Sequence, residues 1–260
     1  MVPRRMFDGG VGRHRRINAM IDLVAILGLG FFLGLRHATD PDHVVAITTI
    51  VSRERSTRAA LAIGALWGLG HSVTILVVGG AIVLFGLVIP PRLGLSMEMA
   101  VAVLLIVLGA MNLTGVLENI LTRGKSNEQR HDGDHDHPRV ALAPSRRLTR
   151  LQSVRPLVIG LVHGLSGSAA VALLVLTTMP DGRWAMVYLA VFGVGTVFGM
   201  MLLTTLMAAP IARAASWSPA AGRGLIRLTG VLSLSFGLFL AYRVGIQDGL
   251  LVGTFHGGLR

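Results

Sequence analysis

Histidine and carboxylate side chains are concentrated in the eight-residue stretch RHATDPDH, residues 36–43. Imidazole and carboxylate groups together are suited to binding nickel, cobalt or zinc. We therefore take His37, Asp42 and His43 as candidate metal ligands, with Asp40 as a further candidate. The alternative is that the two aspartates only complement the dipole of a helix N-terminus, while the histidines lie at an interface. That alternative accounts for the aspartates but not for both histidines.

Other histidines lie in two different kinds of surroundings. His71 stands in the glycine-rich run GALWGLGHS, and His163 stands in GLVHGLSGS. Each could line a transport path, and each could instead pack between helices that small residues bring close together. The tract HDGDHDH contains His131, His135 and His137. Histidine-rich tracts of this kind bind metals, and the alternative is a solvated run of charges.

The elements that must hold these groups are membrane helices. Hydrophobic residues make up 52% of the 260 and charged residues 14%, whereas a soluble domain is about 25% charged. Nearly uncharged runs such as 59–89, 156–179 and 184–211 exceed or approach the roughly 20 residues that a helix needs to cross a bilayer. Runs rich in Leu, Val, Ala and Gly predict helices and not the alternating strands of a membrane barrel. Charged groups inside a membrane are costly and usually functional.

The charge and the cysteine content exclude several classes of protein. The net charge is +11, but the basic residues fall in loops, where the positive-inside bias explains them better than nucleic-acid binding does. The chain has no cysteine, which excludes disulfides, thiolate ligands and membrane thiol–disulfide carriers. A metal site must therefore use histidine, carboxylate, amide or backbone groups. The N-terminus is basic and then apolar, which we interpret as a retained first helix and not as a signal peptide.

Pro41 divides the first apolar region. Proline is excluded from the interior of a helix but suits its first position, and Asp40 is a good N-cap residue. One helix should therefore end near His37 and another begin at Pro41. The predicted membrane segments are 17–36, 42–52, 59–89, 96–121, 156–179, 184–211 and 225–242, of which 42–52 is too short to span alone.

The distribution of Arg and Lys decides between one and two crossings over residues 17–52. With two crossings and the N-terminus inside, 19 basic residues lie on the inner side and five on the outer side. With one crossing they divide into 10 inside and 14 outside. The positive-inside bias favours the first arrangement. The prediction is an all-α integral membrane protein with six to seven transmembrane helices and a broken helix at residues 37–43. The side of the C-terminus stays open.

Two halves of the chain resemble each other. The matching segments lie 126, 125 and 128 residues apart, so their order and spacing hold. Each half has three segments, so the second half enters the membrane from the opposite side. Such inverted repeats, with a site at interrupted helices, are a transporter design. The matches are GLRH (34–37) with GLVH (160–163), WGLGH (67–71) with FGVGT (192–196), and VLLIVLGAM (103–111) with VLSLSFGLF (231–239).

A polar, basic segment separates the halves. The expected domains are a first membrane half over 1–121, a histidine-containing linker over 122–155, and a second membrane half over 156–260. The linker contains eight basic residues, so we place it in the cytoplasm.

The stretch RHATDPDH, residues 36–43, resembles the signature of the nickel/cobalt transporter family. That signature is a histidine followed after four residues by Asp-His, here His37, Asp42 and His43. The family's motif usually has Ala where this chain has Pro41, and Ile where it has Val44.

Two further segments carry the resemblance, which covers roughly residues 30–240. A Gly-His-Ser element of the family is similar to LGHSVTILVVGG, which contains His71. Residues 160–174, GLVHGLSGSAAVALL, resemble a stretch of transporter-like members, some of which are linked to urease. The resemblance implies a multi-pass cell-membrane protein that transports Ni²⁺ or Co²⁺ as substrate, with the His-Asp-His residues selecting and passing the ion. The implied partners are the divalent ion, membrane lipid, and a metallochaperone or urease-maturation protein.

Two rival functions remain open at this stage. A carrier or exporter of another small solute could have the same architecture. Gly164-Leu165-Ser166-Gly167 matches the G-x-S-G pattern of intramembrane serine proteases, but the only later histidine is His256, in the C-terminal tail. The chain has neither an HExxH motif nor a phosphate-binding loop. We therefore expect a secondary transporter, no enzymatic activity and no permanently bound cofactor.

Overall fold

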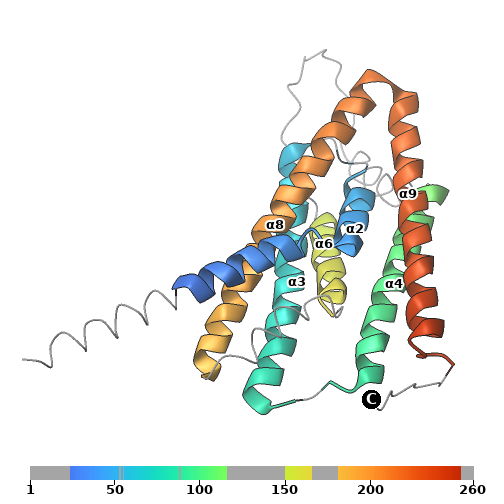
Figure 1. The fold of residues 1–260 in the computed structure, drawn as a ribbon. Helices are drawn as coiled ribbons and strands as arrows, with labels where there is room; N and C mark the ends of the chain where they lie inside the picture. Colours follow the sequence, from blue (N-terminus) through green and yellow to red (C-terminus); the bar gives the residue numbers. More distant parts are fainter. Residues whose placement is uncertain are drawn as a thin grey trace, which may run out of the picture.

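The computed structural model describes residues 24–52, 54, 56–87, 89–115, 150–165 and 181–252. Within these ranges the chain forms helices joined by short turns, and it contains no strand (Figure 1). The all-α membrane class predicted from the composition is confirmed. The tract with His131, His135 and His137 lies outside the described residues, as do most of the linker and Ser166.

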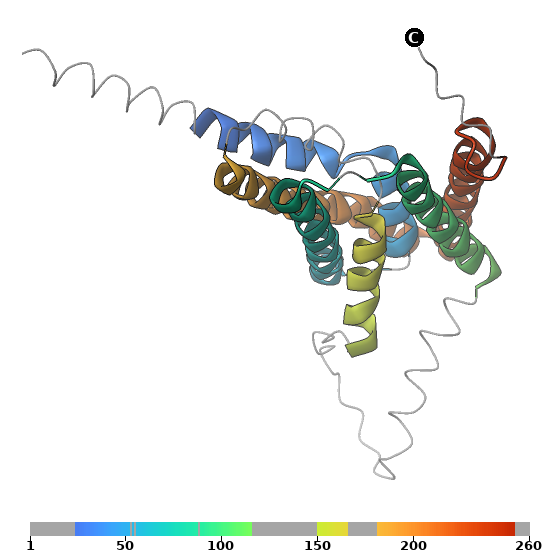
Figure 2. The same cartoon turned by 90° about the horizontal axis from the view of Figure 1, so that it is seen from below.

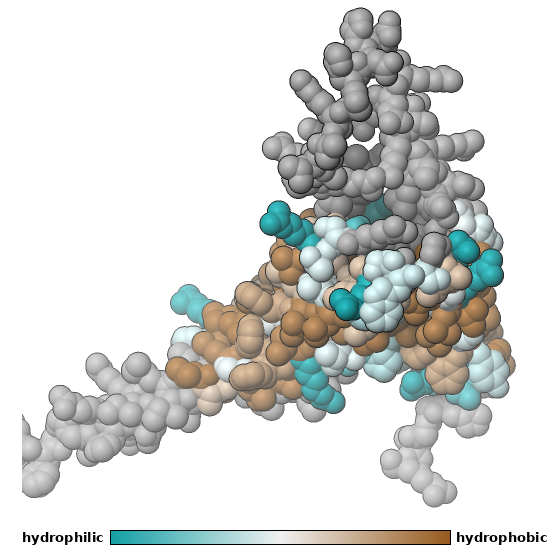
Figure 3. All heavy atoms as spheres, turned by 90° about the horizontal axis from the view of Figure 1, so that it is seen from above, coloured by the Kyte–Doolittle hydropathy of each residue, from teal (hydrophilic) through white to brown (hydrophobic). Residues whose placement is uncertain are grey.

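In the described part of the chain, four long helices are apolar enough to cross a membrane. They are α3 (Thr57–Phe85), α4 (Pro91–Thr114), α8 (Gly182–Trp217) and α9 (Pro219–Tyr242), and α9 continues into the short π-helix η2 (Arg243–Gln247). Large apolar side chains point outward along them, for example Leu69, Val73 and Val77 on α3. Apolar side chains cover much of the described surface in Figure 3. A helix that is apolar on its outer face as well as its inner face is suited to lipid.

Local sequence explains where these helices begin and end. The Ser56 hydroxyl accepts a hydrogen bond from the Ala59 backbone amide at the start of α3, and Asp181 and Ser218 cap α8 and α9 in the same way. Gly86 and Gly115 end α3 and α4 in the left-handed conformation, with φ of 62° and 69°. Glycine adopts that conformation without steric cost, which is why it commonly follows a helix.

The described ranges also contain three shorter apolar helices. They are the helix Val24–His37, α2 (Pro41–Val51) and α6 (Arg150–His163). With 11 residues and a rise of about 1.5 Å per residue, α2 is about 17 Å long and cannot span a bilayer alone, as predicted for 42–52. In Figure 1, α2 and α6 lie near the middle of the height of the long helices.

The helices pack through glycines at their crossings. A Cβ atom on Gly34 would collide with the carbonyl oxygen of Phe192 on α8, and one on Gly160 of α6 would collide with the carbonyl oxygen of Trp67 on α3. Because small residues let helix backbones touch, Val24–His37 lies along α8, and α6 lies against α3 (Figure 2). The helices α4 and α9 form a third close pair. Their arrangement places α2 and the C-terminal end of α6 in the interior, where the buried histidines gather.

Candidate functional site

The predicted break in the first helix lies at residues 38–40. The helix Val24–His37 ends there, a turn follows, and α2 begins at Pro41. Proline costs nothing at this first helical position, since an N–H there would have no helical partner. Asp42 and His43 consequently stand in the first turn of α2, beside the end of the preceding helix. Asp40 takes the N-cap position as predicted, but its side chain makes no capping hydrogen bond.

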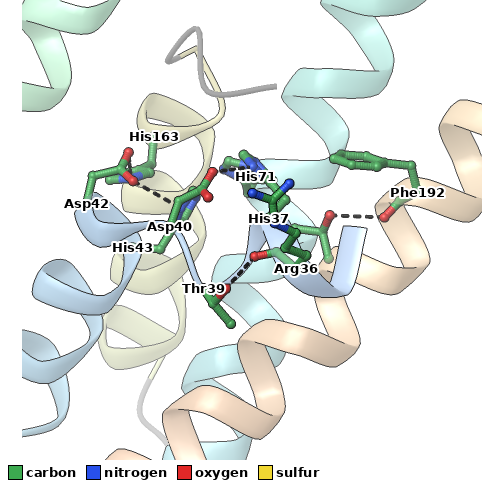
Figure 4. Close-up of polar contacts among 10 residues, drawn as sticks. Arg36, His37, Thr39, Asp40, Asp42, His43, His71, His163 and Phe192 are labelled. Carbon is green, nitrogen blue, oxygen red and sulfur yellow. Dashed lines mark hydrogen bonds and ion pairs between the residues drawn. The ribbon is translucent and has the colours of Figure 1, made fainter. Parts of the chain in front are cut away.

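Two further histidines reach the same place from α3 and α6. His71 is the middle residue of the 29-residue helix α3, and His163 is the last residue of α6. Their rings are 6.2 Å apart between centroids. The glycine contacts explain this approach, because Gly160 of α6 and Gly164, which directly follows α6, lie against the backbone of α3 near His71. Figure 4 shows the side chains of the cluster turned toward one another.

Hydrogen bonds connect the histidines in two groups. His37 Nε2 lies 2.9 Å from His71 Nε2, and His37 Nδ1 lies 2.8 Å from Asp40 Oδ2. Since a carboxylate accepts, His37 donates from Nδ1 to Asp40, and in its neutral form accepts the proton of His71 at Nε2. A carboxylate that fixes the tautomer of a ligand histidine in this way is common around bound metals. Asp40 is therefore a partner of His37, outside the ligand cluster.

The second group is centred on Asp42. One carboxylate oxygen lies 3.1 Å from His163 Nε2, and the other lies 3.3 Å from His43 Nδ1. The ring of His43 is 4.5 Å from that of His163 and 4.8 and 4.9 Å from those of His37 and His71, measured between centroids. His43 thus stands between both groups.

Two sets of three side chains have ligand atoms close enough to share a metal ion. One set is His37, His43 and His71, and the other is Asp42, His43 and His163. Within each set the ligand atoms all lie within 4.8 Å of one another. Imidazole nitrogen with or without a carboxylate suits nickel, cobalt and zinc, whereas magnesium and calcium prefer oxygen ligands.

The cluster is buried, and part of its hydrogen-bonding capacity is unused. The four histidines are at most 6% exposed. Among the residues that the structure describes, neither nitrogen of His43 has a hydrogen-bond partner, and the same is true of Nδ1 of His71 and of His163. Leaving a buried polar atom unpaired costs about 1–3 kcal/mol. Metal coordination is an interaction that would offset this cost.

The ends of three helices meet at the cluster. The C-terminal ends of Val24–His37 and α6 carry the negative end of the helix dipole, and the N-terminal end of α2 carries the positive end. Asp42 in the first turn of α2 opposes that positive end. The local field therefore favours a cation, as at the interrupted helices of transporters.

The structure brings together His37, Asp42, His43, His71 and His163. His163 was as well explained by packing as by a site when only the sequence was considered. The sequence analysis did not include Trp67 near the site. Its ring lies 5.4 Å from that of His163 and 5.7 Å from that of His43, measured between centroids. Its position four residues before His71 could have revealed it, because residues four apart share a helix face.

Comparisons with known proteins give a family match and relatives for this chain. Residues 23–226 match the family model NicO, described as high-affinity nickel-transport protein. The chain is 35% identical over 233 residues to the urease accessory protein UreH of Bacillus sp. (strain TB-90), covering 88% of this chain and 96% of that protein. It is 26% identical over 240 residues to the chloroplast protein FOR GROWTH AND FERTILITY 2 of Arabidopsis thaliana, of which it covers 56%. No solved structure matches the chain.

Proposed function

The chain belongs to the NicO family of high-affinity nickel-transport proteins, and from this premise we propose that it is a secondary transporter that carries nickel across the cytoplasmic membrane. Cobalt is the second substrate to test, because it accepts the same nitrogen and carboxylate ligands.

One observation carries the proposal: four buried histidines and Asp42 converge at the midpoint of the spanning helix α3. Such groups are costly at membrane depth unless they serve a function. Their unpaired nitrogens point to a ligand that accepts lone pairs, which a metal ion does. Metal binding uses the lone pair of a neutral imidazole nitrogen, so the proton between His37 and His71 would have to leave Nε2 of His71, for which the unpartnered Nδ1 of the same ring is available.

We further propose that the two membrane halves are inverted repeats. Supporting this, the close glycine contacts occur in matched pairs. Gly34 meets the Phe192 carbonyl and Gly160 meets the Trp67 carbonyl, and both members of each contact are related by the repeat offsets of 126 and 125 residues. Another pair follows the third offset of 128 residues: Gly109 of α4 meets Gly230 and Leu234 of α9, and Gly237 meets Ala102 and Ile106.

The proposed topology has six to seven crossings, with the N-terminus and linker 122–155 in the cytoplasm. The linker's eight basic residues support this orientation. A cysteine introduced at Ser126, in a chain that has no other cysteine, should resist impermeant thiol reagents in intact cells and react after permeabilisation. Ready labelling in intact cells would overturn the orientation.

The relative from Bacillus supports a role for the metal beyond transport. Its name assigns it to urease accessory proteins, and the segment around His163 resembles a stretch of transporter-like members, some of which are linked to urease. We propose that the transported nickel supplies a maturation protein or metallochaperone for urease.

Flux into sealed vesicles tests the function. Purified protein reconstituted in liposomes should move Ni²⁺, and Mg²⁺ should neither be carried nor compete, since it prefers oxygen ligands. Measuring Ni²⁺ flux under an inward and an outward proton gradient shows whether metal transport is coupled to proton movement. If the reconstituted protein moves an amino acid or another solute but no transition metal, the proposal fails in favour of a carrier of a different substrate.

A further inference from the structure

We propose that the buried cluster offers the ion two adjacent positions that share His43, and that transfer between them is the mid-membrane step of transport. The first, which we call the imidazole position, consists of His37, His43 and His71. The second, the carboxylate position, consists of Asp42, His43 and His163. This inference rests on the proposed function and adds to it how the ion passes through the cluster.

The geometry separates the ligands into two sets. A metal ion binds imidazole nitrogen at about 2.0–2.1 Å, so two ligands of one ion are at most about 4.2 Å apart. Small movements of side chains bring each set of three within that reach, since its atoms already lie within 4.8 Å. The rings of His71 and His163, one from each set, are 6.2 Å apart between centroids, whereas histidine pairs within a set are 4.5–5.0 Å apart.

The two positions exclude simultaneous occupation. Both need His43, and two divalent ions a few ångströms apart in a medium of low dielectric repel each other strongly. One ion per chain should therefore occupy either position.

His43 is placed to serve both positions. Its ring is 4.5–4.9 Å from the other three histidine rings. Nδ1 lies 3.3 Å from an Asp42 carboxylate oxygen without forming a hydrogen bond to it, and Nε2 has no hydrogen-bond partner among the described residues, so no hydrogen bond holds the ring to one set. By contrast, His37 is held by Asp40 and His163 by Asp42. An ion can pass from one set to the other while it keeps one ligand.

The positions also join different parts of the fold. The imidazole position uses only helices of the first half: Val24–His37, α2 and α3. The carboxylate position links α2 to α6 of the second half through Asp42 and His163. An ion in that position adds a bridge of coordinate bonds between the two halves, whereas an ion in the other position leaves only the Asp42–His163 hydrogen bond at this point. Movement of the ion is thereby coupled to the relative freedom of the halves, which alternating access requires.

Trp67 provides a direct readout of binding. Its ring lies 5.4 and 5.7 Å from those of His163 and His43, close enough for paramagnetic Ni²⁺ to quench its fluorescence. The chain's other tryptophans, Trp184 and Trp217, are 46% and 76% exposed. A Trp184→Phe/Trp217→Phe background therefore isolates the signal of Trp67 in the detergent-solubilised full chain.

The test compares Ni²⁺ affinities of His71→Ala, His163→Ala and the double variant in that background. If either position can hold the ion, the association constant of the parent is the sum of the constants of the two positions. Each single variant removes one position, so the variant that retains the stronger position keeps its affinity within about twofold of the parent. The double variant loses both positions and should bind more than about tenfold worse than the product of the single losses predicts, a strong departure from additivity. His43→Ala alone should match the double variant. Thr196→Ala, a buried position outside the cluster, should leave binding unchanged.

A single site using all five ligands gives a different pattern. Both single variants would then lose about tenfold or more in affinity, and their losses would multiply in the double variant. That result overturns the two-position inference. The parent protein separates this failure from failure of the proposed function: if the parent neither binds Ni²⁺ nor moves it into liposomes, the function itself is wrong.

Discussion

The two halves of the membrane domain share their packing but not their chemistry. In both, a glycine near the end of a short helix presses on the backbone of a long helix from the other half: Gly34 on Phe192 of α8, and Gly160 on Trp67 of α3. Four residues after each contacted aromatic, however, the halves differ. α3 carries His71, and α8 carries Thr196, whose hydroxyl donates to the Phe192 carbonyl of its own helix.

This difference shows which features the site requires. The close glycine–backbone contact occurs once in each half, so it belongs to the helix packing that both halves share. Among the described residues, the candidate ligands are concentrated in one half, with His37, Asp42, His43 and His71 from the first half and His163 from the second. The second half therefore contributes a ligand at the one point where its short helix crosses α3.

The largest effect should come from removing a ligand that joins the halves. We expect Asp42→Asn to lower Ni²⁺ flux in liposomes by at least about 100-fold, because the amide cannot neutralise the ion or the positive end of α2. His37→Ala should act in the same direction. Surface biotinylation and size-exclusion profiles would check that both variants insert and fold. Near-normal flux in both would remove the cluster from the transport path.

A smaller but still large effect should follow from disturbing the framework alone. Gly160→Val places a side chain against the Trp67 carbonyl, and such overpacking costs about 1–3 kcal/mol. It should push α6 away from α3, withdraw His163, and lower both thermal stability and flux.

Gly94→Val is the matched control for the framework variant, because a Cβ atom there meets nothing within 4 Å. It should leave flux and melting temperature near those of the parent. If Gly160→Val behaves like this control, the glycine crossing does not position His163.

An intermediate effect is expected at Asp40. Loss of a carboxylate that orients a metal-binding histidine typically costs about 10–100-fold in metal affinity or activity, so Asp40→Leu should lower flux and affinity in that range. Asp40→Asn retains an oxygen that can accept the hydrogen bond from His37 Nδ1 and should restore most of the loss. Equal defects in the two variants would assign Asp40 a role other than positioning His37.

The smallest effect should come from the linker. Deleting residues 131–137 removes His131, His135 and His137, which we expect to raise the local metal concentration without selecting the ion. The metal concentration at half-maximal flux should shift by about a few-fold, while the maximal rate and the preference for nickel over zinc stay the same, because selectivity needs a preorganised site. Flux that disappears in a correctly inserted deletion variant would instead place the essential ligands in the linker.

The sequence predicted the long apolar helices of the described residues and the helix break because both depend on local rules. Pro41 and the charges around it mark a boundary by themselves, and uncharged runs mark the spans. The predicted segment 156–179 is not one continuous helix, because α6 ends at His163 and a turn follows. The sequence alone did not predict that His163 joins the cluster, because this depends on how closely α6 crosses α3. That distance is set by glycine contacts between residues about 90 positions apart, such as Gly160 and Trp67. The role of Asp40 was missed for a related reason, since capping and binding to His37 compete for the same carboxylate.

The coordination of bound nickel tests the central claim most directly. X-ray absorption at the nickel edge should be measured on purified protein that lacks residues 131–137, loaded with one equivalent of Ni²⁺, and on the same protein with His43→Ala. The account predicts at least two imidazole ligands in the parent deletion variant, with their outer-ring scattering, and loss of this signal in the His43→Ala variant. Nickel surrounded only by water or carboxylate oxygen, or an unchanged spectrum after His43→Ala, would contradict it.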